Sequence, residues 1–67
     1  MKKIRFVRES MGLTQFHLGK LVDIRPNRIS YFEHGWAKPT PEEAKRIADY
    51  LKLAPNELLE EVSIQSK

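Results

Sequence analysis

Cysteine is absent from this chain of 67 residues, so neither a disulfide framework nor a thiolate metal site can hold its fold. The chain also lacks an apolar run of the roughly 20 residues that span a bilayer. Its start, Met1 to Arg5, continues into charged residues rather than an apolar signal sequence. We therefore expect a soluble cytoplasmic protein with no membrane segment, whose core is built by side-chain packing alone.

The chain is short and has no internal repeat, low-complexity tract or evident linker. This length is enough for one domain, but it leaves no cleft between domains for an enzyme. A core of this size supplies only roughly 3 to 5 kcal/mol of net stability, which self-association would supplement. We assign residues 1–62 to one domain and residues 63–67 to a C-terminal tail.

Charge and side-chain chemistry narrow the range of functions. The net charge of +3 and the isoelectric point near 9.5 allow a polyanionic partner without identifying it. His17 and His34 have neither cysteine nor a His-x-x-x-His spacing to make a zinc site. The acidic pairs Glu42-Glu43 and Glu60-Glu61 fit a helix start and a solvated helix face. We expect no enzymatic activity, no catalytic residue, no cofactor and no metal.

The residues up to Asp23 predict two short helices. Gly12 is suited to the left-handed backbone that ends the first helix. Thr14 is an N-cap for the second helix, which is expected to end near Asp23. Apolar residues recur at helical spacing in both helices: Ile4, Val7 and Met11 in the first, and Leu18, Leu21 and Val22 in the second.

A third helix is predicted from Pro26 to a stop at Gly35. The proline ring fixes a helical φ at Pro26 and keeps Arg25 before it outside the helical region. Ile29 and Phe32 are the inward-facing residues of this helix. Because so narrow a stripe is buried, most of the third helix is expected to face outward.

Thr40 begins the clearest helix of the chain, because Pro41 takes the first helical position and Glu43 completes a capping box. Its apolar residues follow at positions i, i+3, i+4 and i+7, and are Ala44, Ile47, Ala48 and Leu51. Pro55 is expected to begin a fifth helix, whose apolar residues are Leu58, Leu59 and Val62. No segment alternates like a strand, so the predicted fold class is all-α with five helices.

A pattern of spaced residues covers nearly the whole chain. Its members are Arg8, Leu13-Thr14-Gln15, Leu18, Ile29-Ser30, Phe32-Glu33, Gly35, Pro39 and Asn56 to Leu59. In this pattern the chain resembles the Cro/C1-type helix-turn-helix family of lambdoid phage repressors and bacterial Xre-like regulators. The resemblance implies a five-helix, lambda-repressor-like domain that binds double-stranded DNA.

Five departures from that family affect helix ends, turns and helix propensity. They are Gly19 in place of Ala, Asp23 in place of Gly, Arg25 in place of a capping Ser or Thr, Lys52 in place of Gly and Ala54 in place of a capping Ser. We expect these departures to lower stability rather than to change the fold. Gly19, for example, is expected to cost up to ~1 kcal/mol of helix propensity relative to Ala.

The resemblance places the third helix along the major groove. The expected base-reading residues are Pro26, Asn27, Arg28 and Tyr31. Asn27 matches an adenine edge, Arg28 matches guanine or a phosphate, and Tyr31 matches a thymine methyl group or a phosphate. Without the family pattern, the alternative is that Asn27 only caps the helix and Arg28 only remains solvated.

The residues expected at the DNA backbone are Gln15, Arg25, His34, Trp36 and Lys38. Gln15 lies in the first turn of the second helix, where free N–H groups and the helix dipole favour an anion. Trp36 has two readings of equal weight, a contact with the sugar-phosphate backbone and a cover over the edge of the core.

Two further sets of residues are expected to be structural. In the family, the positions of Arg8 and Glu33 form an ion pair between helices. Leu59, Val62 and Ile64 are expected at a dimer interface, whereas Leu58 is the stronger core candidate.

The expected function is that of a sequence-specific transcriptional regulator, a repressor that binds a palindromic operator as a homodimer. The alternative is an antitoxin-type module that binds a protein partner and also its own promoter. Phe6 and Phe16 motivate this alternative, because the family more often has polar residues there. Local packing against Met11 and the chain start is the slightly preferred explanation for these two side chains.

Overall fold

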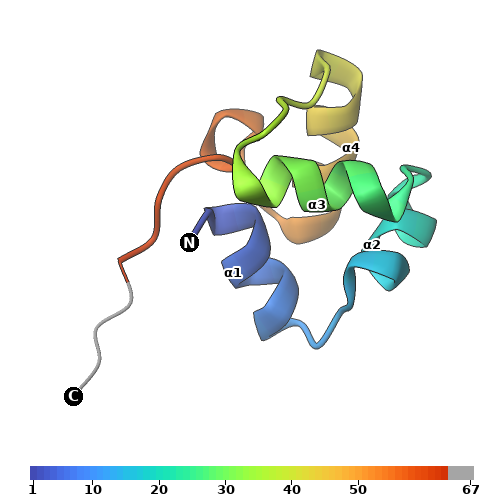
Figure 1. Ribbon diagram of the computed structural model, residues 1–67, viewed down its shortest axis with the longest axis horizontal. Coiled ribbons are helices and arrows are strands. Elements are labelled where there is room, and N and C mark those ends of the chain that lie inside the picture. The colour runs from blue at the N-terminus through green and yellow to red at the C-terminus, as the bar shows by residue number, and fades with distance from the viewer. Residues whose placement is uncertain (64–67) are drawn as a thin grey trace.

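The computed structural model describes residues 1–63. It contains four α-helices, α1 (Lys3–Ser10), α2 (Gln15–Val22), α3 (Pro26–His34) and α4 (Pro41–Leu51), and one 3-10 turn, η1 (Pro55–Glu57) (Figure 1). The part of the chain that is described has no strand beyond one isolated bridge, which confirms the all-α class. None of these helices is long and apolar enough to cross a membrane.

The predicted fifth α-helix is wrong, because only the single turn of η1 forms after Pro55. The residues after η1 pair instead with the start of the chain. The Lys3 backbone N–H donates to the Glu60 carbonyl at 2.7 Å, and the Val62 N–H donates to the Met1 carbonyl at 2.7 Å. Backbone groups that a helix would pair locally are therefore used between segments far apart in the sequence.

Most helix boundaries follow from the capping residues. The Thr14 hydroxyl accepts from the His17 N–H at 3.0 Å at the start of α2. Thr40 and Glu43 form both halves of the predicted capping box at the start of α4, at 3.2 and 3.0 Å. Asp23 ends α2, as predicted, and has a left-handed backbone with a φ of 60°. Tight turns therefore join α1, α2 and α3.

The core lies between all four helices and the segment after η1. Its buried apolar residues are Ile4, Leu18, Val22, Ile24, Ile29, Phe32, Ile47, Ala48, Leu51 and Leu58. Two residues assigned to inward-facing helix stripes are instead exposed. Met11 is 45% exposed because α1 ends at Ser10, and Leu21 is 52% exposed at the edge of α2. The inward assignment of these two side chains is therefore corrected.

Gly19 has a structural role that its helix propensity does not indicate. It is buried on the side of α2 that faces the turn into α3. A Cβ at this position would collide with the backbone carbonyl oxygen of Ile24 and would lie 3.4 Å from the Pro26 nitrogen. The expectation that Gly19 only weakens the helix is therefore wrong, since the close approach of the turn requires a residue without a side chain.

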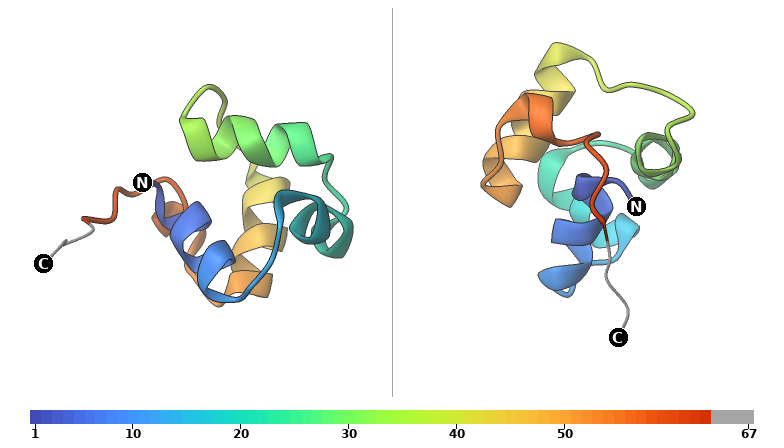
Figure 2. Two further views of the ribbon diagram at one scale, coloured as in Figure 1. Left: turned by 60° about the horizontal axis from the view of Figure 1, so that its bottom comes forward. Right: turned by 90° about the vertical axis from the view of Figure 1, so that its left-hand side faces the viewer.

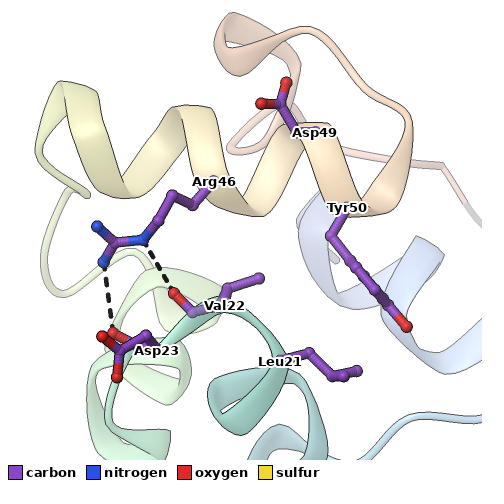
Figure 3. Close-up of a pocket in the computed structure, with 6 residues that line it drawn as sticks. All are labelled: Leu21, Val22, Asp23, Arg46, Asp49 and Tyr50. Atoms are coloured by element: carbon purple, nitrogen blue, oxygen red, sulfur yellow. Dashed lines mark hydrogen bonds between the residues drawn. The ribbon is translucent and has the colours of Figure 1, made fainter.

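Arg46 of α4 binds the backbone at the end of α2 (Figure 3). Its Nε donates to the Val22 carbonyl at 2.9 Å, and its Nη2 donates to the Asp23 carbonyl at 3.3 Å. These are carbonyls that the end of a helix leaves without an intrahelical partner. Beside them lies an open groove of about 480 Å³ lined by Leu21, Val22, Asp23, Arg46, Asp49 and Tyr50. A side chain of α4 thus ties the C-terminal end of α2 to α4.

Candidate nucleic-acid interface

The α3 helix lies along one side of the molecule, at the top of the left view in Figure 2, with α1, α2 and α4 below it. Its buried residues are Ile29, Phe32 and Glu33, and the two apolar ones are fully covered. These three share one face at helical spacing, and within residues 1–63 no other element covers the opposite face of α3, where Asn27 and Tyr31 are exposed. A nine-residue helix is therefore presented outward at the edge of the domain.

Two of the four residues predicted to read bases are on this outward face. Asn27 and Tyr31 are both exposed, with Tyr31 at 41%, and they lie one turn apart. Pro26 is half-buried at the first position of α3, where it sets the helix start. The first two turns of α3 thus present the amide of Asn27 and the phenol of Tyr31 on the outward face.

Arg28, the fourth of these residues, is half-buried and already has a partner. Its Nε donates to Oε2 of Glu43 at 2.9 Å, and its Nη2 donates to Oε1 of Glu43 at 2.7 Å. The hydrogen bond from Arg28 lowers the pKa of the Glu43 carboxyl below its usual value and raises the pKa of Arg28. The guanidinium is therefore fixed to the start of α4 rather than being freely solvated.

Three aromatic rings gather at the C-terminal end of α3. The His34 and Trp36 rings stack with centroids 4.4 Å apart and planes 19° apart, and Tyr31 lies 5.9 Å from Trp36. The His34 Nδ1 is 2.9 Å from the Ser30 carbonyl, so this nitrogen bears a proton if the contact is a hydrogen bond. Trp36 is 70% exposed and does not cover the core edge, which corrects one of its two expected readings.

The start of α2 is tied to α3 by a buried polar network. Arg8 donates to both carboxylate oxygens of Glu33, at 2.6 and 3.0 Å, and to the Leu13 carbonyl at 2.6 Å. Gln15 donates from Nε2 to Oε1 of Glu33 at 3.0 Å. The carboxylate of Glu33 thus joins α1, α2 and α3, and it leaves Gln15 with one more amide hydrogen and its carbonyl oxygen.

The remaining residues expected at a DNA backbone lie at both ends of α3. Arg25 is exposed directly before the helix, and Lys38 is exposed in the segment between Gly35 and Thr40. Together with His34 and Trp36 they flank the outward face that contains Asn27. The surface is therefore polar and aromatic along the helix and cationic at its ends.

The residues expected at a dimer interface are partly used within the chain. Leu59 is half-buried and packs against the core, and Val62 is half-buried while its backbone pairs with Met1. Ile64 lies outside the described residues. Leu59 and Val62 thus lie in one region of the structure, beside the start of the chain.

Glu43 and Arg46 are the functional neighbours that sequence reasoning missed. The sequence pattern indicates only a capping role for Glu43 and no role for Arg46. The start-of-helix pattern gives no sign of contacts to α3 or α2, because both are contacts across more than a dozen residues. The described residues hold no group of three His, Asp or Glu side chains placed to bind a metal ion.

Comparison with known proteins agrees with this geometry. A family model described as a helix-turn-helix domain matches residues 1–64, which is nearly the whole chain. No curated protein and no solved structure shows a significant match. The match is consistent with the Cro/C1-type resemblance, and domains of this kind are found in DNA-binding regulators. The chain belongs to the helix-turn-helix domain family.

Proposed function

We propose that the protein is a sequence-specific regulator of transcription that binds double-stranded DNA through the outward face of α3. The observation that carries the proposal is the burial of Ile29 and Phe32, which leaves Asn27 and Tyr31 exposed on the face of α3 that no other part of residues 1–63 covers. An α-helix fits the major groove, and the first residues of such a helix contact base edges.

Each exposed group has a role that its chemistry supports. The Asn27 amide pairs with the N6 and N7 edge of an adenine, and Tyr31 packs against a thymine methyl group or donates to a phosphate. Gln15 contacts a phosphate through its remaining amide hydrogen, beside the N–H groups that begin α2. Arg25 and Lys38 neutralise phosphates at either end of α3.

The flanking aromatic residues belong to the same surface. His34 and Trp36 form a stacked pair next to Tyr31 and pack against the sugar-phosphate backbone. The modest net charge of +3 suits a protein that needs both phosphate contacts and contacts with bases.

The repressor role and the dimer complete the proposal. A domain that occupies an operator represses without any chemical step. Two copies related by a two-fold axis bind half-sites about 10 to 10.5 base pairs apart on a palindrome. Leu59, Val62 and Ile64 contribute to the contact between the two copies; the first two are only half-buried by their own chain, so part of each side chain remains accessible to a partner.

Selection of bound duplexes from a random pool tests the function directly. The full chain is incubated with the pool at moderate salt, and the retained sequences are read. The proposal predicts an enriched motif with two-fold symmetry and a half-site spacing close to one helical turn of DNA. Recovery of unselected sequences would reject base reading, and an asymmetric single site would reject the dimer.

Exposed apolar side chains favour a second candidate, an antitoxin-type module with a protein partner. Phe6 is 42% exposed and Phe16 is 57% exposed, so the expected packing of both against Met11 and the chain start is corrected. Phe16 instead contacts His17 edge-on and lies under the Lys20 ammonium. Copurification with the product of a neighbouring gene, lost in Phe16→Ser but kept in Asn27→Ala, would support this candidate.

A further inference from the structure

The carboxylate of Glu43 is held more rigidly than its place in a helix cap requires. Its Oε1 accepts from the Thr40 N–H at 3.0 Å and from Nη2 of Arg28 at 2.7 Å. Its Oε2 accepts from Nε of Arg28 at 2.9 Å. The Glu43 side chain is only 16% exposed. A single carboxylate therefore completes the cap of α4 and fixes a side chain of α3.

Arg28 is held in a defined plane by these contacts. Its Cζ lies 5.1 Å from the centre of the Phe32 ring, which is itself buried. Its Nε and one Nη2 hydrogen face Glu43, so one donor edge of the planar fork is used. Among the described residues, Nη1 has no hydrogen-bond partner, and the side chain is 38% exposed. The second edge, made by Nη1 and Nη2, thus remains available.

We propose that Glu43 is a positioning residue for DNA recognition: it holds Arg28 so that the free guanidinium edge pairs with the O6 and N7 atoms of one guanine. The inference rests on the proposed function and adds a specificity-determining pair to it. Arg28 is the third residue of α3 and lies one turn before Tyr31, in the half of the helix whose side chains reach base edges.

Rigid orientation distinguishes a guanine contact from a phosphate contact. A guanine presents two acceptors in one plane and at one place in the groove, so a fixed fork gains specificity from a fixed plane. A phosphate accepts hydrogen bonds from many directions and needs no such holding. The bidentate contact with Glu43, added to the contact with Phe32, therefore favours a base as the ligand of Arg28.

Because Glu43 is negatively charged, the direction in which DNA binding changes when this charge is removed tests the inference. A carboxylate close to DNA repels the phosphates, so its removal without any other consequence would tighten binding to every duplex. Glu43→Gln keeps an oxygen for the Thr40 N–H, because glutamine also completes capping boxes, but it removes the charged acceptor of Arg28. Glu42→Gln is the matched control, since Glu42 is the neighbouring residue with an 81% exposed side chain.

The experiment measures binding of the wild type and variants to the selected operator and to versions with each base pair changed. In Glu43→Gln we expect the preference for guanine at one position per half-site to fall about tenfold. Glu42→Gln is expected to keep that preference and to bind all duplexes slightly more tightly. Arg28→Lys, which keeps the charge but loses the fork, is expected to lose the preference at the same position.

Each outcome decides the inference. The inference is supported if Glu43→Gln and Arg28→Lys lose the guanine preference at the same base-pair position. Equal behaviour of Glu43→Gln and Glu42→Gln overturns it, and a uniform loss in Arg28→Lys overturns the guanine contact in favour of a phosphate. If Glu43→Gln does not fold, Arg28→Lys alone decides whether a guanine is read. A wild-type chain without any sequence preference would instead reject the proposed function.

Discussion

The backbone carbonyl of Ile24 occupies the space that a side chain on Gly19 would need. This relationship sets how closely the turn after α2 can approach the helix before it. Since α3 begins two residues after Ile24, the position of the outward helix depends on a buried residue of α2 that has no side chain.

Gly19→Ala is expected to destabilise the protein by about 1 to 3 kcal/mol, because the added methyl group pushes the turn away from α2. Helix propensity alone predicts the opposite, a gain of roughly 1 kcal/mol. Urea unfolding, monitored by circular dichroism, distinguishes these two predictions. A variant more stable than the wild type would show that the turn relaxes without cost.

Arg46→Met tests the hydrogen bonds between α4 and the end of α2 that Figure 3 shows. The variant keeps an apolar stem and loses the hydrogen bonds to the Val22 and Asp23 carbonyls, which is expected to cost about 1 to 2 kcal/mol. Lys45→Met is the control, because the Lys45 pair with Asp49 is exposed on both sides and is worth at most about 0.5 kcal/mol. Equal unfolding midpoints for the two variants would contradict a role of Arg46 in the turn.

Acid is expected to destabilise the fold through Glu43. Its hydrogen bond with Arg28 lowers the pKa of this carboxyl in the folded state below the usual value near 4.5. The ionised form therefore stabilises the fold fully above about pH 4.5, and this contribution is lost as the pH falls through the lower, folded-state pKa. Thermal melts between pH 7 and pH 3 measure the loss.

The variants used above also serve in the acid series. Glu43→Gln is expected to flatten the fall of the melting temperature below pH 4.5 more than Glu42→Gln, since the Glu43 carboxyl has a lowered pKa and the Glu42 side chain is 81% exposed. The same slope in both variants and in the wild type would assign the acid sensitivity to other carboxylates, such as Glu57 and Glu61, whose pKa values are also lowered.

Lys38→Ala is expected to weaken binding to operator and to random DNA by the same factor. A lost phosphate contact releases one counterion fewer, so the slope of log K against log salt falls by about one unit. Titrations over a salt series measure this slope. An unchanged slope would remove Lys38 from the phosphate contacts.

Local signals explain why much of the fold was predictable. Pro26 and Gly35 bound α3, and Thr40 with Glu43 marks the start of α4, because these residues act on their own backbone within a few positions. The narrow inward stripe of α3 followed from the same spacing. The outward face of the candidate site could therefore be predicted as well.

Long-range contacts explain what was missed. The segment after η1 pairs with the chain start, and no local pattern near Pro55 shows that its carbonyls have partners more than fifty residues away. The capture of Arg28 by Glu43 and the requirement for Gly19 likewise depend on how helices meet. The type of a residue and the spacing of its neighbours do not show which side chain or carbonyl of another helix it will contact.

The most direct test of the account compares Asn27→Ala with the wild type on the selected operator and on random duplex DNA at the same salt concentration. If the outward face of α3 reads bases, the variant loses roughly 1 to 3 kcal/mol of discrimination while its binding to random DNA is unchanged. An equal loss on both duplexes, or no loss on either, would contradict base reading by this helix.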